Sequence, residues 1–432
     1  MKAVISDRIY LKGTPELIDS IKKKLTYRIE TKISGRGGKT QLSVDIIRNY
    51  KQLPRDVLSI PRGRIDLIPK EYEIVDKRIL HFADFPEPRH ELREGQLAVY
   101  NEVESDCFIN ALVGWGKTFT ALHIARKLGQ KTLVITHTTM LRDQWIKEVQ
   151  ELYGFTPGTI GAGIFDIDSP IVIGNVQSVT KNVLAIAKEF GTIIMDEAHH
   201  APASTFTSII DSSHARYRIA LSGTMVRKDG RHILFPDYFG QLILKPPQSH
   251  TLNPTIKIVK TGLQLTPGET WARKINNLLY DPDYQEYVAT IAATQISIGH
   301  RVLVIADRVE FLENVQKWLG EETCVLVTGQ TSFEDRERVK DQINSGKVLC
   351  IAGSRQIFSE GISVNSLSCV ILATPISNES LLEQIIGRIM RDFPGKLTPV
   401  VIDLQFAGVA DKKQNNLRLG FYLNKGWEVQ AL

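Results

Sequence analysis

Short apolar runs alternate with amphipathic stretches from about residue 80 to the C-terminus. This alternation predicts a mostly parallel β-sheet with helices on both faces. A first series of buried strands is expected at Cys107–Leu112, Thr132–Thr136, Ile171–Ile173, Thr192–Met195 and Tyr217–Leu221. A second series is expected at Val302–Ala306, Thr323–Val327, Val348–Ala352, Cys369–Ala373 and Val400–Leu404. The pattern therefore predicts an α/β protein with two tandem parallel-sheet lobes, joined by a linker near Leu244–Asn253.

The first 80 residues follow a different pattern, which predicts a small α+β unit ahead of the lobes. Lys2–Leu11 alternates as one strand would, and further short strands are expected at Leu42–Ile47 and Arg64–Ile68. Pro15 begins a helical pattern whose apolar residues recur on one face. We therefore expect an N-terminal α+β domain, a first lobe and a second lobe, at residues 1–80, 81–248 and 249–432.

Composition places the chain among ordinary globular proteins. Of its 432 residues, 43% are apolar and 23% are charged, which excludes general disorder. No apolar run approaches the roughly 18–20 residues of a membrane-spanning helix, and the N-terminus lacks the long apolar core of a signal peptide. Four cysteines lie far apart in the sequence and form no Cys-x-x-Cys pair. This spacing argues against a zinc site and a disulfide framework, and it suits a reducing cytoplasm.

Positive charge is concentrated at the N-terminus. The whole chain has a net charge of +5, whereas residues 1–90 hold 19 lysines and arginines against 12 acidic residues. Lys22, Lys23 and Lys24 cluster on the expected helix, and residues 34–38 form a basic, glycine-rich turn. A basic surface attracts a phosphate backbone whatever its base sequence. A solvated lysine-rich face is the alternative, and charge asymmetry alone does not separate the two.

The segment Ala111–Thr118 has the composition of a phosphate-binding loop between a buried strand and a helix. Its glycines, Gly114 and Gly116, would let backbone N–H groups turn toward a phosphate. The Lys117 ammonium would reach the β- and γ-phosphates, and the Thr118 hydroxyl would bind magnesium. The strict pattern begins with a glycine, and this chain has Ala111 at that position. For this motif alone, a strand–turn–helix without a nucleotide is the alternative.

A second candidate site follows the apolar strand Thr192–Met195, which ends in Asp196 and Glu197. Ligands bind at the carboxyl ends of such strands. Asp196 would hold magnesium, and Glu197 would orient and deprotonate an attacking water. A solvated acidic turn is the alternative for these residues alone. His199 and His200 follow and raise a second metal-site hypothesis, against which stands the absence of a further ligand at helical spacing.

Two arginines lie three residues apart in Gln384–Arg391, a segment for which we predict a helix. Arg388 and Arg391 would share one face of that helix. Two guanidinium groups facing a phosphate chain would neutralise the charge that develops during phosphoryl transfer. Taken alone, the segment is more typical of a solvated helix.

Taken together and in this order, the motifs resemble those of the superfamily 2 helicases and translocases over residues 92–391. Arg227–Gly230 is similar to the XPB-like branch of that family. Phe358–Ser363, Leu417–Tyr422 and Gly426–Glu428 are similar to the UvsW-type recombination helicases of tailed bacteriophages. Three positions depart from the family pattern: Ala111, Met225 and Ser363. The resemblance implies two RecA-like lobes, with ATP and Mg²⁺ as cofactors.

The resemblance also implies which residues handle ATP. Leu92–Gln96 looks like an adenine-reading motif, with Gln96 as the reader. The implied nucleotide loop consists of Val113, Gly114, Trp115, Gly116, Lys117 and Thr118, with Thr118 and Asp196 as the magnesium ligands. The implied catalytic residues are Lys117, Asp196, Glu197, His199, Gln384, Arg388 and Arg391. In this family ATP lies between the lobes, so the two arginines are expected to reach it when the lobes close.

Other motifs imply contacts with nucleic acid. The segments that resemble the family's binding and coupling motifs are 136–145, 174–178, 221–224, 302–307, 327–329 and 358–363. Such contacts reach the phosphate backbone and carry no base sequence information. The implied contact residues are Thr136, His137, Gln144, Gln177, Ser178, Thr328, Gly329 and Gly361, with Lys22, Lys23 and Lys24 at the N-terminus.

The resemblance implies an ATP-dependent DNA helicase or translocase that remodels forks and Holliday junctions in recombination, repair or replication. The expected partner is branched or forked DNA, and the expected state is a monomer or transient oligomer. The expected location is the cytoplasm, that of the host cell if the protein is viral. An RNA helicase, an ATP-gated nucleic-acid clamp and the translocating subunit of a restriction complex are the alternatives. ATP turnover with DNA and RNA structures would separate them.

Overall fold

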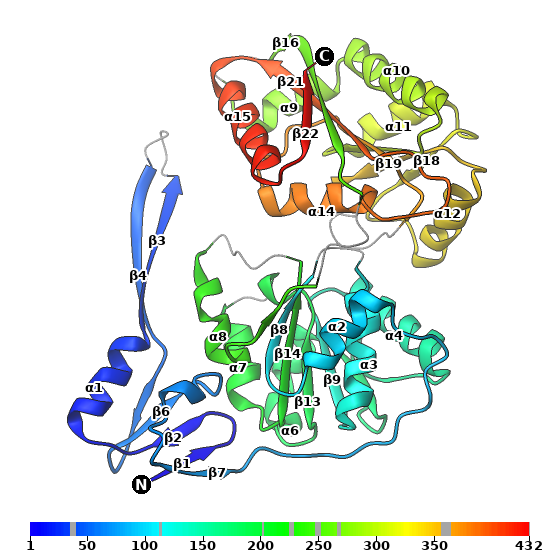
Figure 1. Ribbon diagram of the computed structural model, residues 1–432. Helices are drawn as coiled ribbons and strands as arrows, with labels where there is room; N and C mark the ends of the chain where they lie inside the picture. Colours follow the sequence, from blue (N-terminus) through cyan, green and yellow to red (C-terminus); the bar gives the residue numbers. More distant parts are fainter. Residues whose placement is uncertain are drawn as a thin grey trace. The chain divides into compact units, whose positions relative to one another are not determined.

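The chain divides into two units, Met1–Pro247 and Gln248–Leu432, each with its own hydrophobic cores (Figure 1). The computed structural model describes residues 1–34, 40–111, 115–200, 203–223, 229–246, 252–265, 269–355 and 364–431. Within these ranges, no helix has the length and apolar character that crossing a bilayer would require.

A five-stranded sheet begins the first unit, in the order β5-β6-β2-β1-β7. Its strands are β1 (Lys2–Ile5), β2 (Ile9–Leu11), β5 (Lys51–Leu53), β6 (Val57–Ile60) and β7 (Glu73–Asp76). The single strand predicted over Lys2–Leu11 is wrong, because the chain turns at residues 6–8 and β1 pairs antiparallel with β2. Odd-numbered apolar residues are buried on both sides of the turn. The alternation therefore continues through the turn and conceals it.

The strand predicted over Arg64–Ile68 is also wrong. Residues Ile65–Leu67 form a 3₁₀ helix, η1. The backbone N–H groups of Leu67 and Ile68 donate to the carbonyl groups of Arg64 and Ile65. These local i→i+3 bonds satisfy the backbone without a neighbouring strand.

Helix α1 (Pro15–Lys24) packs on the five-stranded sheet, and a long antiparallel hairpin follows it. The hairpin strands β3 (Thr26–Ser34) and β4 (Thr40–Arg48) pair along their whole length and extend away from that sheet (Figure 1). The strand predicted over Leu42–Ile47 lies within β4. Residues 35–39, which hold most of the predicted basic turn, lie outside the described residues.

The first lobe is built on an eight-stranded sheet in the order β11-β10-β12-β9-β13-β14-β8-β15. Its pairings are parallel except for that of β10 with β11. The expected strands are present as β8 (Cys107–Asn110), β9 (Thr132–Thr136), β12 (Ile171–Asn175), β13 (Thr192–Met195) and β14 (Tyr217–Ser222). The sheet also contains β10 (Gly158–Gly161), β11 (Ile164–Phe165) and β15 (Ile243–Leu244). Parallel pairing places the carboxyl ends of the central strands along one edge.

Helices cover both faces of this sheet. One hydrophobic cluster holds residues of α2 (Glu94–Glu102), α3 (Lys117–Leu128) and α4 (Thr139–Tyr153). The other holds residues of α5 (Val176–Lys181), α6 (Val183–Ile186), η2 (Ala198–His200), α7 (Ala203–Ser212), η3 (Arg231–Leu234) and α8 (Phe235–Phe239). The first lobe is therefore a three-layer α/β structure.

The second unit has a seven-stranded, wholly parallel sheet in the order β18-β19-β17-β20-β21-β16-β22. The expected strands are present as β17 (Val302–Ala306), β18 (Cys324–Val327), β19 (Cys350–Ser354), β20 (Cys369–Leu372) and β21 (Val400–Ala407). The strands β16 (Thr255–Gln264) and β22 (Glu428–Ala431) complete it. The four cysteines are free and buried, and Cys324 lies opposite Cys350 on neighbouring strands.

Helices again cover both faces of the second sheet. One cluster holds residues of α9 (Trp271–Leu279), α10 (Pro282–Ile298) and α11 (Val309–Leu319). The other holds residues of α12 (Phe333–Ser345), α14 (Glu379–Ile389) and α15 (Val409–Asn424). Both units are parallel-sheet lobes of the predicted α/β class.

Buried ion pairs join the N-terminal sheet to the first lobe. Arg8 Nη1 lies 2.5 Å from Asp211 Oδ2, and Arg62 Nη2 lies 3.0 Å from Asp106 Oδ2. The sequence pattern does not reveal these pairs, because their partners lie far apart in the chain. They fix the N-terminal residues to the lobe within one unit.

Candidate active site

The first candidate group lies where β8 leads into α3. Gly116 caps α3 with a φ of 96°, in the left-handed region that glycine adopts without strain. Lys117 begins the helix, and its Nζ donates to the Ala111 carbonyl oxygen at 3.0 Å. Backbone N–H groups at the start of a twelve-residue helix favour an anion. Of the predicted loop residues, Val113 and Gly114 lie outside the described residues.

Gln96 packs directly against this loop. Its side chain is 3% exposed, and its Nε2 donates to the Trp115 carbonyl oxygen at 3.2 Å. A Cβ at position 116 would stand 2.4 Å from that Nε2, so a larger residue there would displace the Gln96 side chain as well as strain the backbone. Sequence reasoning missed Arg93, whose Nη2 donates to the same carbonyl oxygen at 2.6 Å. Arg93 could have been predicted from its position three residues before Gln96 at the start of α2. There the Gln96 Oε1 accepts the Arg93 backbone N–H.

The acidic pair lies at the end of β13, on the same edge of the sheet. Asp196 is 7% exposed, and its two carboxylate oxygens accept from the Trp145 Nε1 at 2.8 Å and the Glu197 backbone N–H at 2.9 Å. Glu197 has a φ of 44° and lies 3.7 Å from the Lys117 Nζ. Burial, and then the neighbouring Glu197 carboxylate, raise the pKa of Asp196 to about 6.

His199 connects the acidic pair to the next strand. Its Nδ1 lies 2.6 Å from the Ser222 Oγ at the end of β14 and 3.3 Å from Glu197 Oε2. A hydrogen bond of this kind fixes the orientation of the imidazole ring. Within the described ranges, no three His, Cys, Asp or Glu side chains gather as a metal site, and the His200 side chain is outside them.

Nucleotide phosphates and Mg²⁺ fit the charges at this edge. Asp196 and Glu197 place two carboxylates beside the Lys117 ammonium, and the raised pKa of Asp196 reflects the poor solvation of its negative charge. A divalent cation would relieve that cost. The Thr118 hydroxyl, on the first turn of α3, is a hard oxygen ligand of the kind that Mg²⁺ prefers.

The predicted nucleic-acid residues of the first lobe gather at the ends of β9 and β12. Thr136 lies opposite Asn175 in register, and its buried hydroxyl donates to the carbonyl groups of Thr138 and Gly174 at 3.3 and 3.4 Å. Gln177 is exposed, and three further candidates are partly buried, namely His137, Gln144 and Ser178. The structure therefore brings His137, Gln177 and Ser178 to neighbouring strand ends, which Thr136 joins, whereas Gln144 lies within α4.

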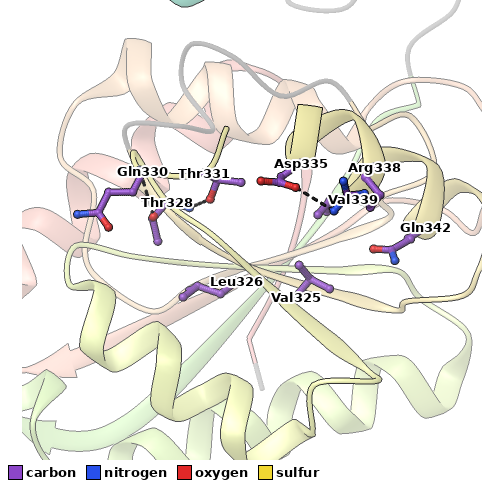
Figure 2. Close-up of a pocket in the computed structure, with 9 residues that line it drawn as sticks. All are labelled: Val325, Leu326, Thr328, Gln330, Thr331, Asp335, Arg338, Val339 and Gln342. Atoms are coloured by element: carbon purple, nitrogen blue, oxygen red, sulfur yellow. Dashed lines mark hydrogen bonds and ion pairs between the residues drawn. The ribbon is translucent and has the colours of Figure 1, made fainter. Parts of the chain in front are cut away.

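One predicted residue of the second unit lines a cavity of about 470 Å³ between β18 and α12 (Figure 2). Thr328 lines it, and its backbone N–H donates to the Thr331 Oγ1 at 2.9 Å. Gly329 is exposed at the same turn. Asp335 and Arg338 of α12 line the cavity and pair at 2.9 Å. Gly361 lies outside the described residues.

Helix α14 carries Gln384 and Arg388, both buried. The prediction that it continues to Arg391 is wrong, because α14 ends at Ile389. The Met390 carbonyl oxygen accepts from the Leu252 backbone N–H, outside the helical pattern. Pro394 follows shortly after, as is common beyond a helix end. Arg391 therefore follows the helix, and its Nη1 donates to Asn365 Oδ1 at 3.0 Å.

The predicted lysine cluster lies on the last turn of α1. Lys23 and Lys24 are exposed, whereas the Lys22 ammonium lies 5.9 Å from the centre of the Tyr50 ring. Two of the three lysines are therefore fully accessible to a polyanion.

Comparisons with known proteins relate both lobes to helicases. Residues 87–227 match the family "Type III restriction enzyme, res subunit", and residues 285–392 match "Helicase conserved C-terminal domain". The chain is 41% identical to the probable helicase D10 of Escherichia phage T5 over 437 residues, covering 99% of this chain and 96% of that protein. It is 26% identical to the ATP-dependent DNA helicase uvsW of Enterobacteria phage T4 over 330 residues, covering 68% of this chain and 63% of that one.

A solved structure supports the fold. S. cerevisiae Dbp5 bound to RNA and ADP BeF3 matches with a TM-score of 0.56 at 12% identity, covering 80% of this chain and 90% of that one. At this identity the likeness concerns the fold alone. Together with the sequence matches, it agrees with the two parallel-sheet lobes described above.

Proposed function

Because the chain belongs to the superfamily 2 helicases, close to those of phages, we propose that it is an ATP-driven DNA motor that remodels branched DNA. The observation that supports it most is the meeting of Lys117, Asp196 and Glu197 at one edge of the first sheet. A phosphate-binding cation, a metal-binding acid and a candidate base are the parts that nucleotide hydrolysis needs.

Each residue has a distinct part in hydrolysis. The Lys117 ammonium binds the β- and γ-phosphates, and Gln96 and Arg93 support the loop beside it. Thr118 and Asp196 hold Mg²⁺, which supplies charge neutralisation to the phosphate oxygens. Glu197 orients a water molecule and accepts its proton. His199 holds Glu197 on one side and Ser222 on the other.

The arginines of the second unit would complete the reaction. We assign Arg388 and Arg391, with Gln384 beside them, to the charge that develops on the phosphates during turnover. Arg388 is buried in the last turn of α14, whereas Arg391 follows the end of the helix. The helix therefore holds Arg388, whereas a hydrogen bond to Asn365 holds Arg391.

The substrate assignment rests on relatives and on charge. The T4 relative is named a DNA helicase, and the α1 lysines offer a basic surface to duplex DNA. The strand-end residues of the first lobe and the Thr328 turn would contact the phosphate backbone without reading bases. We place the protein in the cytoplasm of an infected cell, as a monomer or transient oligomer.

A strand-product assay tests the substrate directly. Labelled forked DNA and an RNA duplex of the same length are incubated with the full chain, ATP and Mg²⁺. We expect rearranged DNA strands from the fork and none with Lys117→Ala. Products from the RNA duplex alone would favour an RNA helicase. Binding of the fork without products would favour an ATP-gated clamp.

A further inference from the structure

Trp145 connects α4 with the acidic end of β13. The side chain is 0% exposed, and its Nε1 donates to Asp196 Oδ2 at 2.8 Å. The other oxygen of the same carboxylate accepts the Glu197 backbone N–H. Each oxygen of Asp196 therefore has a donor, and the indole is the donor that comes from outside the β13 turn.

The same helix also contacts the end of β12, a strand that β9 separates from β13 in the sheet. Thr138 caps α4, and its Oγ1 accepts the Leu141 backbone N–H at 3.2 Å. Arg142 is buried, and its Nη1 donates to Asn175 Oδ1 at the end of β12 at 3.2 Å. Arg142 and Trp145 stand three residues apart, so they project from the same side of α4.

Helix α4 thus contacts two places that the proposed function uses. Its cap directly follows His137, and Arg142 donates to Asn175, two residues before Gln177. Nucleic-acid contacts are proposed at His137 and Gln177. One turn later, Trp145 reaches the carboxylate proposed to hold Mg²⁺. A helix is a rigid element, so a shift of its first turn also moves the indole.

We propose that Trp145 is a positioning residue, whose indole N–H sets the Asp196 carboxylate for Mg²⁺ and makes ATP hydrolysis respond to nucleic acid bound beside α4. This inference rests on the proposed function and specifies how its nucleotide site is regulated. Trp145 acts through Asp196 and touches neither nucleotide nor nucleic acid itself.

The inference depends on the indole N–H, because packing alone would not orient the carboxylate. Trp145 belongs to the same hydrophobic cluster as Ile194 and Leu221, and a phenylalanine would fill most of that space. Without the donor, a buried oxygen of Asp196 would lose its partner. A hydrogen bond to a charged group commonly contributes a factor of about ten or more to an equilibrium.

Two variants of the full chain separate the donor from the packing. In the first, Trp145→Phe, the N–H and some volume are lost. In the second, 3-benzothienylalanine replaces Trp145, so that sulfur stands in place of the N–H and the ring shape is kept. Trp427→Phe is the matched control, because Trp427 is also buried but packs with Phe421 and Tyr422 in the second unit.

The first readout is MgCl₂-dependent binding of a fluorescent, non-hydrolysable ATP analogue. Both Trp145 variants should need about tenfold more MgCl₂ for half-maximal binding, with little change in binding without metal. The second readout is the ratio of ATP turnover with forked DNA to turnover without it. That ratio should fall several-fold for both variants and remain unchanged for Trp427→Phe.

The outcomes distinguish this inference from the proposed function. Unchanged MgCl₂ dependence in the benzothienyl variant, or an unchanged ratio, would overturn the role of Trp145. A change in Trp145→Phe alone would assign the effect to packing and would also overturn it. If the wild-type chain shows no MgCl₂-dependent binding, or if Lys117→Ala hydrolyses ATP normally, the proposed nucleotide site itself is wrong.

Discussion

Glu197, the proposed general base, shows most clearly how the fold holds a single candidate residue in place. Its φ of 44° places a non-glycine residue in the left-handed region, which costs about 1–3 kcal/mol. Its backbone N–H binds the Asp196 carboxylate, and its side chain lies between Lys117 and His199. These contacts maintain the strained backbone and direct the carboxylate of Glu197 toward the proposed phosphate site.

Replacing this acid tests whether it acts in chemistry or in structure. Glu197→Gln keeps the size of the side chain but cannot accept a proton from water. We expect ATP turnover to fall at least about a hundredfold while ATP binding persists. Equilibrium titration with a fluorescent ATP analogue and a steady-state turnover assay provide the two measurements. A comparable loss of nucleotide affinity would make Glu197 a structural residue.

Lys396 provides a pH-dependent prediction. Burial and the nearby Arg391 lower the pKa of Lys396 to about 7, and its Nζ donates to the carbonyl groups of Arg391 and Asn365. An unfolded lysine titrates near pH 10.4, so from about pH 7 to 10 the unfolded chain holds a proton that the folded chain lacks. This group therefore increases folding stability as pH rises through that window.

Thermal unfolding of Lys396→Met measures this contribution. The melting temperature of the wild type minus that of the variant should increase between pH 7 and pH 9.5. Lys412→Met is the control, because Lys412 is an exposed lysine of α15. It measures how the melting temperature responds to the loss of a lysine side chain that is not buried. A wild-type advantage that decreases over this range would contradict the lowered pKa.

Among the elements, α8 is where the N-terminal hairpin joins the first lobe. Its residue Asp237 is 1% exposed and accepts from the Asn49 Nδ2 at 2.7 Å and the Tyr27 hydroxyl at 2.8 Å. Arg64 Nη1 lies 3.3 Å from the same carboxylate. One buried acid therefore joins three segments of the N-terminal part to the lobe.

Removing that acid should destabilise the first unit. Asp237→Ala leaves the Asn49 amide and the Tyr27 hydroxyl without their shared partner, whereas Arg64 keeps its ion pair with Asp66. We expect a loss of about 2–4 kcal/mol in the free energy of unfolding, measured by chemical denaturation. Glu73→Ala is the control, because its ion pair with Lys2 is exposed and contributes at most about 1 kcal/mol. Equal effects of the two changes would show that Asp237 does not join the parts.

Sequence patterns predicted most central strands, because parallel strands buried on both faces are continuous apolar runs. They did not predict the turn in Lys2–Leu11, because the apolar alternation continues through it. They did not predict the end of α14 either, because there the Met390 carbonyl oxygen accepts a long-range hydrogen bond from the Leu252 backbone N–H. They located Lys117, Asp196 and Glu197 from local spacing. They could not locate the Trp145 bond or the Arg8–Asp211 pair, because tertiary packing alone brings those residues together.

At the scale of the whole molecule, charge separates the N-terminal part from the rest. Residues 1–90 have more positive charge than the whole chain's net +5, so the remaining residues are net negative, and α1 ends in three lysines. We propose that this part grips duplex DNA beside a junction. Deleting residues 1–80 is a poor test, since it would strip Asp106, Asp211 and Asp237 of their buried partners.

A triple substitution on α1 is the cleaner experiment. Replacing Lys22, Lys23 and Lys24 with alanine should weaken binding of forked DNA most at low salt. The slope of log affinity against log salt should fall by about one for each lost phosphate contact. Lys412→Ala with Lys413→Ala, on exposed positions of α15, controls for loss of charge elsewhere. If the slope of log affinity against log salt is unchanged in the triple variant, the α1 lysines form a solvated face and do not bind DNA.

The central claim is that this chain couples ATP hydrolysis to branched DNA. The measurement that tests it most directly is ATP turnover by the purified full chain with forked DNA, linear duplex DNA, an RNA duplex or no nucleic acid. We predict the highest rate with forked DNA, several-fold above that without nucleic acid, and near-zero turnover by Glu197→Gln under every condition. Turnover that is indifferent to nucleic acid, or that is highest with RNA, would contradict the account.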